Sequence, residues 1–219
     1  MRTIELRNVT KCIKGNMVLR EVKCKLEGGR IYGLVGRNGS GKTMLLRMMA
    51  GLILPTQGQV IVDGEPLHKT ISFPKDMGIL IEKPEMMIDL SGLENLKLLA
   101  EIRGVIEETT IREYMQLFSL DPDSRQPVKK YSLGMKQKIG IIQALMEGPS
   151  LLLLDEPFNA LDEHSVELLR KLLLKCKKEG KLVVITSHHR EDIEAICDSI
   201  LPMEEGRIDS RGMSVWIDR

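Results

Sequence analysis

Residues 36–43 read Gly-Arg-Asn-Gly-Ser-Gly-Lys-Thr and fit the pattern G-x-x-x-x-G-K-[ST] at every fixed position. This spacing lets successive backbone N–H groups turn inward around phosphate oxygens, because glycine tolerates positive φ and a close approach. Lys42 would place a positive charge on the outer phosphates, and the hydroxyl of Thr43 would ligate Mg²⁺. The segment therefore predicts a nucleotide phosphate site, to which we assign Gly36, Asn38, Gly39, Ser40, Gly41, Lys42, Thr43 and Met44.

The sequence on either side of this loop supports the prediction. Residues 31–35 form a short apolar run typical of a buried strand, and residues 44–50 are mostly helix formers. The loop would thus join a strand to a helix, and a helix N-terminus favours anionic groups. A chance glycine turn would not require this strand and this helix.

The composition is that of a globular protein with one large domain, or one domain carrying an inserted subdomain. Of the 219 residues, 42% are hydrophobic and 29% charged, with a formal net charge of +1. This charge and an aromatic content of 3% give no reason to expect a nucleic-acid partner. Four cysteines without a C-x-x-C pair indicate reduced thiols. No secretory leader is visible, and no run approaches about 18 apolar residues, so we expect no membrane-spanning segment.

Hydrophobic patterning divides the chain into an α/β part and a helical block. Before the block, strands are expected at residues 3–10, 17–26, 31–35, 59–62 and 77–81. The block holds helix candidates at residues 91–103, 108–120 and 133–146. After it, strands are expected at residues 151–154, 182–186, 199–202 and 207–209, and helices at 162–178 and 190–197. We therefore expect a single domain, residues 1–219, with an α/β core of residues 1–83 and 149–219 and a helical subdomain of residues 84–148.

A second group of candidate functional residues follows the four leucines at residues 151–154. This run is typical of a central parallel strand, and it ends at Asp155 and Glu156. Parallel sheets bind ligands at the carboxyl ends of their strands, so Asp155 would hold Mg²⁺ directly or through water. Glu156 would orient or deprotonate a water that attacks the terminal phosphate. An acidic turn that only caps a helix is the alternative, and the phosphate loop in the same chain favours the functional interpretation.

Together with three further motifs, these sites resemble those of the nucleotide-binding subunits of ATP-binding cassette (ABC) transporters, over residues 4–208. Residues 131–137, Tyr-Ser-Leu-Gly-Met-Lys-Gln, resemble the family signature Leu-Ser-Gly-Gly-Gln; they keep Ser132 and Gly134 and depart from it at the other three positions. The sequence Asn-Ala-Leu-Asp at residues 159–162 resembles the D-loop and ends in Asp162. The sequence Thr-Ser-His at residues 186–188 resembles the switch region and ends in His188.

The resemblance implies a P-loop NTPase (RecA-like) core with an N-terminal antiparallel β-subdomain and an inserted helical subdomain. It also implies a head-to-tail dimer, in which ATP on the phosphate loop of one subunit meets Ser132 and Gly134 of the other, and Asp162 lies at the dimer interface. A neutral His188 would hydrogen-bond the terminal phosphate and the attacking water. The expected cofactors are ATP and Mg²⁺. The expected catalytic residues are Lys42, Glu156 and His188, and the expected metal ligands are Thr43, Asp155 and Glu82.

Two positions depart from the family pattern. The family usually has glutamine at the strand end before the helical block, where this chain has Glu82. Exporters of drugs and peptide antibiotics resemble this form, and a carboxylate would still ligate Mg²⁺. The family often stacks adenine on an aromatic side chain after the first strand, where this chain has Ile13. An apolar contact without π stacking leaves the choice between ATP and GTP open.

By this resemblance, the chain is expected to be the ATPase subunit of an exporter of drugs, peptides or lipid-like compounds. Its partners would be a second copy of itself, or a paralogous ATPase subunit, and a separate integral-membrane permease. It would lie in the cytoplasm, bound peripherally to the inner face of the cell membrane. The alternative is a soluble ABC ATPase acting in translation or DNA repair. Those relatives generally have two cassettes, long coiled coils or basic extensions, and this sequence contains none of these.

Overall fold

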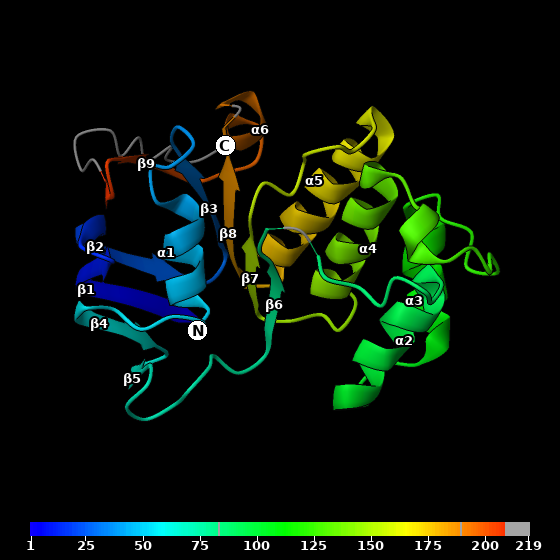
Figure 1. Ribbon diagram of the computed structural model, residues 1–219, viewed down its shortest axis with the longest axis horizontal. Coiled ribbons are helices and arrows are strands. Elements are labelled where there is room, and N and C mark those ends of the chain that lie inside the picture. The colour runs from blue at the N-terminus through cyan, green and yellow to red at the C-terminus, as the bar shows by residue number, and fades with distance from the viewer. Residues whose placement is uncertain (83, 189, 209–219) are drawn as a thin grey trace.

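The computed structural model describes residues 1–82, 84–188 and 190–208, whose strands form two sheets (Figure 1). The four-stranded sheet is antiparallel and contains, in spatial order, β2 (Asn16–Glu27), β1 (Thr3–Ile13), β4 (Gln57–Val62) and β5 (Glu65–Pro66). The six-stranded sheet contains β10 (Arg207–Ile208), β9 (Ser199–Glu204), β3 (Arg30–Val35), β8 (Leu182–Ser187), β7 (Leu151–Leu154) and β6 (Met77–Leu80). Its strands are parallel except for β10, which pairs antiparallel with β9.

Helix α1 (Lys42–Met49) lies between the two sheets (Figure 1). Its buried Leu45, Leu46 and Met49 share one hydrophobic core with residues of both sheets, such as Ile4 of β1 and Leu153 of β7. A helix buried on both sides in this way has little freedom to move. The loop that precedes it is therefore fixed at the carboxyl edge of the six-stranded sheet.

The four leucines of β7 explain why this strand lacks a polar face. Leu151 and Leu153 face the core around α1, and Leu152 and Leu154 face the second core. This second core is formed by α4 (Leu133–Leu145), α5 (Glu163–Lys178) and α6 (Arg190–Glu194). Side chains alternate between the two faces of a strand, so a strand covered on both faces must be apolar throughout.

The helical block contains α2 (Gly92–Arg103), α3 (Glu108–Leu117), a 3-10 turn (Val128–Lys130) and α4. A capping box is present at the start of α2: Ser91 Oγ accepts from the N–H of Glu94 at 3.3 Å, and Glu94 Oε2 accepts from the N–H of Ser91 at 2.7 Å. The apolar side chains of the block belong to the same core as Leu152 and Leu154. The block is thus packed against the six-stranded sheet through α4.

Every expected strand and helix is present, with small differences at the ends. Helix α3 ends at Leu117 and not at residue 120, because Ser119 adopts a positive φ of 56° that stops the helix. Strand β4 begins at Gln57, two residues earlier than expected, where Gln57 pairs with Thr10 of β1. The expected strand end at residue 209 lies outside the described residues. Among the described helices, none has both the length and the apolar character that crossing a bilayer requires.

Candidate functional site

The predicted phosphate loop joins β3 to α1, as the sequence indicated. Gly39 and Gly41 adopt positive φ angles of 82° and 106°, which other residues rarely tolerate. A Cβ atom at Gly36 would lie 2.3 Å from the carbonyl oxygen of Met203, so the loop approaches β9 too closely for a side chain there. The N–H of Gly206 donates to the carbonyl of Ser40 at 3.0 Å. The turn between β9 and β10 therefore supports the loop from outside.

Lys42 is almost fully buried, although it carries a charge. Its Nζ donates to the carbonyl oxygens of Gly36 at 2.7 Å and Arg37 at 3.3 Å, and it lies 3.9 Å from Glu156 Oε1. A buried ammonium needs such partners, because an unpaired charge in the interior is costly. The ammonium is thus held at the phosphate loop, facing the carboxylate of Glu156.

A pocket of about 270 Å³ lies above the loop and contains most of the predicted site residues. The described residues that line it are Val18, Asn38, Gly39, Ser40, Gly41, Lys42, Thr43, Met44, Arg47, Glu82, Asp155 and Glu156. These residues come from β2, the phosphate loop, α1, the segment after β6 and the segment after β7. The structure therefore brings together residues that are more than 130 positions apart in the sequence.

Asp155 is held by two hydroxyl groups. Its Oδ2 accepts from Thr43 Oγ1 at 2.7 Å, and its Oδ1 accepts from Thr186 Oγ1 at 2.6 Å. Carboxylate and hydroxyl oxygens are ligands that suit Mg²⁺, which usually binds one or two such protein groups together with substrate phosphates and water. No group of three His, Cys, Asp or Glu side chains suitable for a metal occurs within residues 1–82, 84–188 and 190–208. The donors present thus fit Mg²⁺ bound together with a nucleotide.

Glu156 stands next to Asp155 in a turn with a positive φ of 48°. Its Oε2 lies 2.8 Å from Nδ1 of His188, and its own N–H donates to Thr186 Oγ1 at 2.9 Å. The contact arises because β8 lies beside β7 in parallel, with Leu154 opposite Ile185, so the segments that follow the two strands meet at one edge. The arrangement places a carboxylate and an imidazole side by side at the phosphate pocket.

The three residues expected to act across a dimer lie outside the described lining of this pocket. Ser132 caps α4, with its Oγ accepting from the N–H of Met135 at 3.2 Å. Asp162 caps α5 by accepting from the N–H of Ser165 at 2.8 Å, and it pairs with Lys138 at 2.7 Å. These contacts, with Lys138 first, hold the pKa of Asp162 well below its usual range. A Cβ atom at Gly134 would lie 2.6 Å from the carbonyl oxygen of Ala160.

The comparison with protein families identifies the family of this chain. Residues 19–159 match the family model described as "ABC transporter". The chain belongs to the ABC transporter family. It is an ATP-binding ATPase subunit of an ABC transporter, which confirms the expected family, fold class and activity. The alternative of a non-transport ABC ATPase is not favoured.

Relatives of this ABC subunit cover nearly its whole length. It is 46% identical over 207 residues to the uncharacterized ABC transporter ATP-binding protein YybJ of Bacillus subtilis, covering 94% of this chain and 95% of YybJ. It is 38% identical to the bacitracin transport ATP-binding protein BcrA of Enterococcus faecalis, covering 94% and 67% of the two chains. A dimeric structure of the bacterial ABC transporter cassette MJ0796 superposes with a TM-score of 0.86 at 25% identity, covering 99% of this chain and 100% of that one.

Three residues at the phosphate pocket of this ABC subunit differ from the sequence expectations. Ile13 lies at the end of β1, is 37% exposed, and is not among the described residues that line the pocket. Val18 of β2 lines the pocket and was not predicted, and neither was Arg47. Arg47 could have been found from its spacing, because it lies four residues after Thr43 and so on the same face of α1. Glu82 lines the pocket as expected, but its Oε2 pairs with Arg47 at 2.6 Å.

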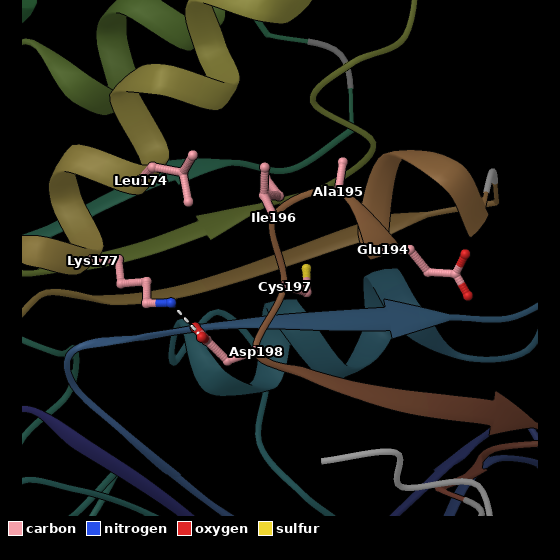
Figure 2. A pocket seen from close by; sticks show the side chains of 7 residues that line it. All are labelled: Leu174, Lys177, Glu194, Ala195, Ile196, Cys197 and Asp198. Atoms are coloured by element: carbon pink, nitrogen blue, oxygen red, sulfur yellow. Dashed lines mark hydrogen bonds and ion pairs between the residues drawn. The ribbon is translucent and has the colours of Figure 1, made fainter. Parts of the chain in front are cut away.

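A second pocket, of about 390 Å³, lies between α5 and the segment that joins α6 to β9 (Figure 2). It is lined by Leu174, Lys177, Glu194, Ala195, Ile196, Cys197 and Asp198. Lys177 pairs with Asp198, and the other carboxylate oxygen of Asp198 accepts from the N–H of Ile31 at 2.9 Å. Burial raises the pKa of the Cys197 thiol, so this cysteine is not a reactive thiolate. This pocket is larger than the phosphate pocket, but it lacks the phosphate loop and the carboxylates of Asp155 and Glu156.

Proposed function

We propose that this subunit drives a separate membrane permease by closing with a second copy of itself, or with a paralogous ATPase subunit, around two ATP molecules. The observation that carries the proposal is the division of the predicted site into two surfaces. One surface holds Lys42, Thr43, Asp155 and Glu156 in a single pocket, and His188 contacts Glu156 beside it. The other holds Ser132, Gly134 and Asp162, at helix starts outside the described lining of that pocket. The dimeric cassette structure to which the chain is similar supports this pairing.

In the proposed reaction, the protein positions ATP and stabilises charge. Lys42 and the N-terminus of α1 bind the outer phosphates, and Thr43 and Asp155 are the residues that would hold Mg²⁺. Bound Mg²⁺ neutralises charge on the phosphate oxygens. Glu156 takes up the proton of the attacking water or orients that water, and the imidazole of His188 orients Glu156 and contacts the terminal phosphate.

The proposed cargo class rests on named relatives. BcrA of Enterococcus faecalis is a bacitracin transport protein, and SrtF of Streptococcus pyogenes, 33% identical over 94% of this chain, is a lantibiotic transport protein. Both names concern peptide antibiotics. We therefore propose export of a peptide antibiotic or a related drug or lipid-like compound, with the subunit bound to its permease at the inner face of the cell membrane.

The role of Glu156 is tested by the variant Glu156→Gln. We expect ATP hydrolysis to fall by about 10² to 10⁴, as is typical when general acid–base assistance is lost. ATP affinity should stay near the parental value, because the substitution keeps the shape of the side chain. Hydrolysis is measured as phosphate release and affinity by titration calorimetry, with Glu101→Gln, at an exposed residue of α2, as a control. Hydrolysis at the parental rate would show that Glu156 is not the base.

The permease is tested by recovering the tagged subunit from detergent-solubilised native membranes, with and without ATP. We expect recovery of a membrane protein with several hydrophobic segments of spanning length, and its identity would narrow the cargo class. Recovery of ribosomal or DNA-repair components without any membrane partner would contradict the transport role.

A further inference from the structure

Arg47 and Glu82 form an ion pair at the phosphate pocket, and neither belongs to the phosphate loop. Arg47 Nη2 lies 2.6 Å from Glu82 Oε2, and both residues line the pocket. The Arg47 side chain is 34% exposed and that of Glu82 is 55% exposed, so the pair stands at the mouth of the pocket. The family pattern, which usually has a neutral glutamine at position 82, does not call for a cationic partner there.

The backbone fixes both partners beside Thr43 and Asp155, the two other predicted metal ligands. Arg47 follows Thr43 by one helical turn, so the two side chains project from the same face of α1. Glu82 comes two residues after the end of β6, in a turn with a positive φ of 61°. Strand β6 runs parallel to β7, and the N–H of Asp155 donates to the carbonyl of Leu80 at 2.6 Å. Glu82 and Asp155 therefore leave the sheet at adjacent positions.

The charges of the pocket show why the pair matters for a phosphate ligand. Its described lining carries three carboxylates, Glu82, Asp155 and Glu156, and two cations, Lys42 and Arg47. Asp155 is held by two threonine hydroxyls, and Glu156 faces Lys42 and His188. Glu82 is the additional negative charge, and Arg47 is the cation beside it. An incoming polyphosphate would be repelled by Glu82 unless that charge were neutralised.

We propose that Arg47 is a positioning residue that neutralises Glu82 and holds it to one side of the pocket, so that the phosphates of a nucleotide can enter before Mg²⁺ is bound. This inference rests on the proposed nucleotide site. The action of Arg47 passes through Glu82, and not through a direct contact of the guanidinium with phosphate. Its effect on affinity should therefore depend on the charge at position 82.

The test is a double-mutant cycle of ATP affinity with Mg²⁺ removed by EDTA, using the parent, Arg47→Ala, Glu82→Gln and the double variant. Arg47→Ala should weaken ATP binding about threefold or more, because Glu82 is then unpaired beside the phosphates. In the Glu82→Gln background the same substitution should change affinity less than about twofold. The loss in Arg47→Ala should shrink as salt is raised, since salt screens exposed charges.

Two variants give the matched controls. Arg112 of α3 is also 34% exposed and pairs with Glu108 and Asp123, far from the pocket in the helical block. Arg112→Ala should leave ATP affinity unchanged. Arg47→Lys keeps the positive charge and should retain most of the affinity. Thermal melting of each variant confirms that it is folded.

The outcomes separate this inference from the proposed function. If Arg47→Ala weakens ATP equally in both backgrounds, Arg47 contacts the phosphates itself and the inference is wrong. If it has no effect in either background, Glu82 needs no neutralisation and the inference is equally wrong. In both cases the nucleotide site stands, provided that the parent binds ATP and Lys42→Ala does not. If the parent chain fails to bind ATP, the proposed site and the inference fall together.

Discussion

The phosphate pocket and the signature segment, both expected to contact ATP, are built very differently. In the pocket, five segments of the chain meet, and their charged groups form close pairs: Lys42 faces Glu156, and Arg47 pairs with Glu82. Glu156 also contacts His188, which follows β8. In the signature segment, residues 131–137, Ser132 bonds within the start of its own helix, and Asp162 of the D-loop beside it bonds within the start of α5 and to Lys138. The pocket is arranged for a ligand within one chain. In the proposed dimer, the signature segment would contact ATP only when a second chain supplies the phosphate pocket.

Helix α4 links the two regions. Gln137 Nε2 donates to the carbonyl oxygens of Glu156 at 3.3 Å and Pro157 at 3.2 Å. A displacement of the signature helix would therefore pull on the backbone of Glu156, the proposed catalytic base. This connection gives a physical route by which contact at Ser132 could influence hydrolysis on the same chain.

The largest expected effect of a single substitution on binding is at Lys42. Lys42→Ala removes the one ammonium at the phosphate loop among the described lining residues, so ATP affinity should fall by about 100-fold or more. Titration calorimetry with Mg²⁺ and ATP measures this. Lys129→Ala, which removes an exposed cation paired with Asp89 in the helical block, should leave affinity unchanged. Equal affinities for the parent and Lys42→Ala would contradict the assignment of the pocket.

A smaller effect is expected at Gly134, where stability and hydrolysis should change and ATP binding should not. Its Cβ in Gly134→Ala would lie 2.6 Å from the carbonyl of Ala160, so α4 and the D-loop must move apart, at a cost of about 1–3 kcal/mol in stability. ATP binding to the single chain should persist, while hydrolysis should fall. Denaturant unfolding and phosphate release measure the two effects. Leu133→Ala, at a neighbouring residue that is 61% exposed, is the control for stability. Weaker ATP binding by the monomer would contradict the separation of the phosphate pocket from the signature segment.

The smallest effect is expected at Asp162, on the free energy of unfolding. Because Lys138 and the start of α5 lower the pKa of this carboxyl on folding, its contribution is complete above the unfolded value of about 4 and is lost as pH falls through the folded value. Asp162→Ala should cost about 1 kcal/mol at pH 7, a modest figure because the pair is largely exposed. The difference between parent and variant should shrink below about pH 4. A difference that stays constant from neutral to acid pH would exclude the carboxylate charge as its source.

The sequence predicted best what depends on local chemistry. The phosphate loop has fixed glycine and lysine positions, and the leucines of β7 have no polar alternation. Each of these follows from the conformation or burial of a few consecutive residues. The order of strands in the sheet then places Asp155, Glu156 and His188 together, as parallel strands predict.

The features that the sequence did not predict depend on which distant segments of the chain pack together. The pairing of Arg47 with Glu82 joins α1 to the segment after β6, and no local pattern indicates which cation a lone carboxylate will meet. Val18 reaches the pocket because β2 passes over Gly41, whereas Ile13 lies at the hairpin tip. The end of α3 was misplaced because apolar Phe118 and Leu120 continue to be buried after the helix has ended.

The most direct test of the account is the mass in solution of Glu156→Gln with saturating Mg²⁺ and ATP, measured by light scattering. We expect twice the 24.7 kDa of one chain, because ATP that is not hydrolysed keeps two chains closed. The mass should return to that of one chain with ADP, or when Ser132→Arg is added to disrupt the opposing surface. A single-chain mass with saturating ATP, or a dimer that Ser132→Arg leaves intact, would contradict a site shared between the phosphate pocket and the signature segment of two copies.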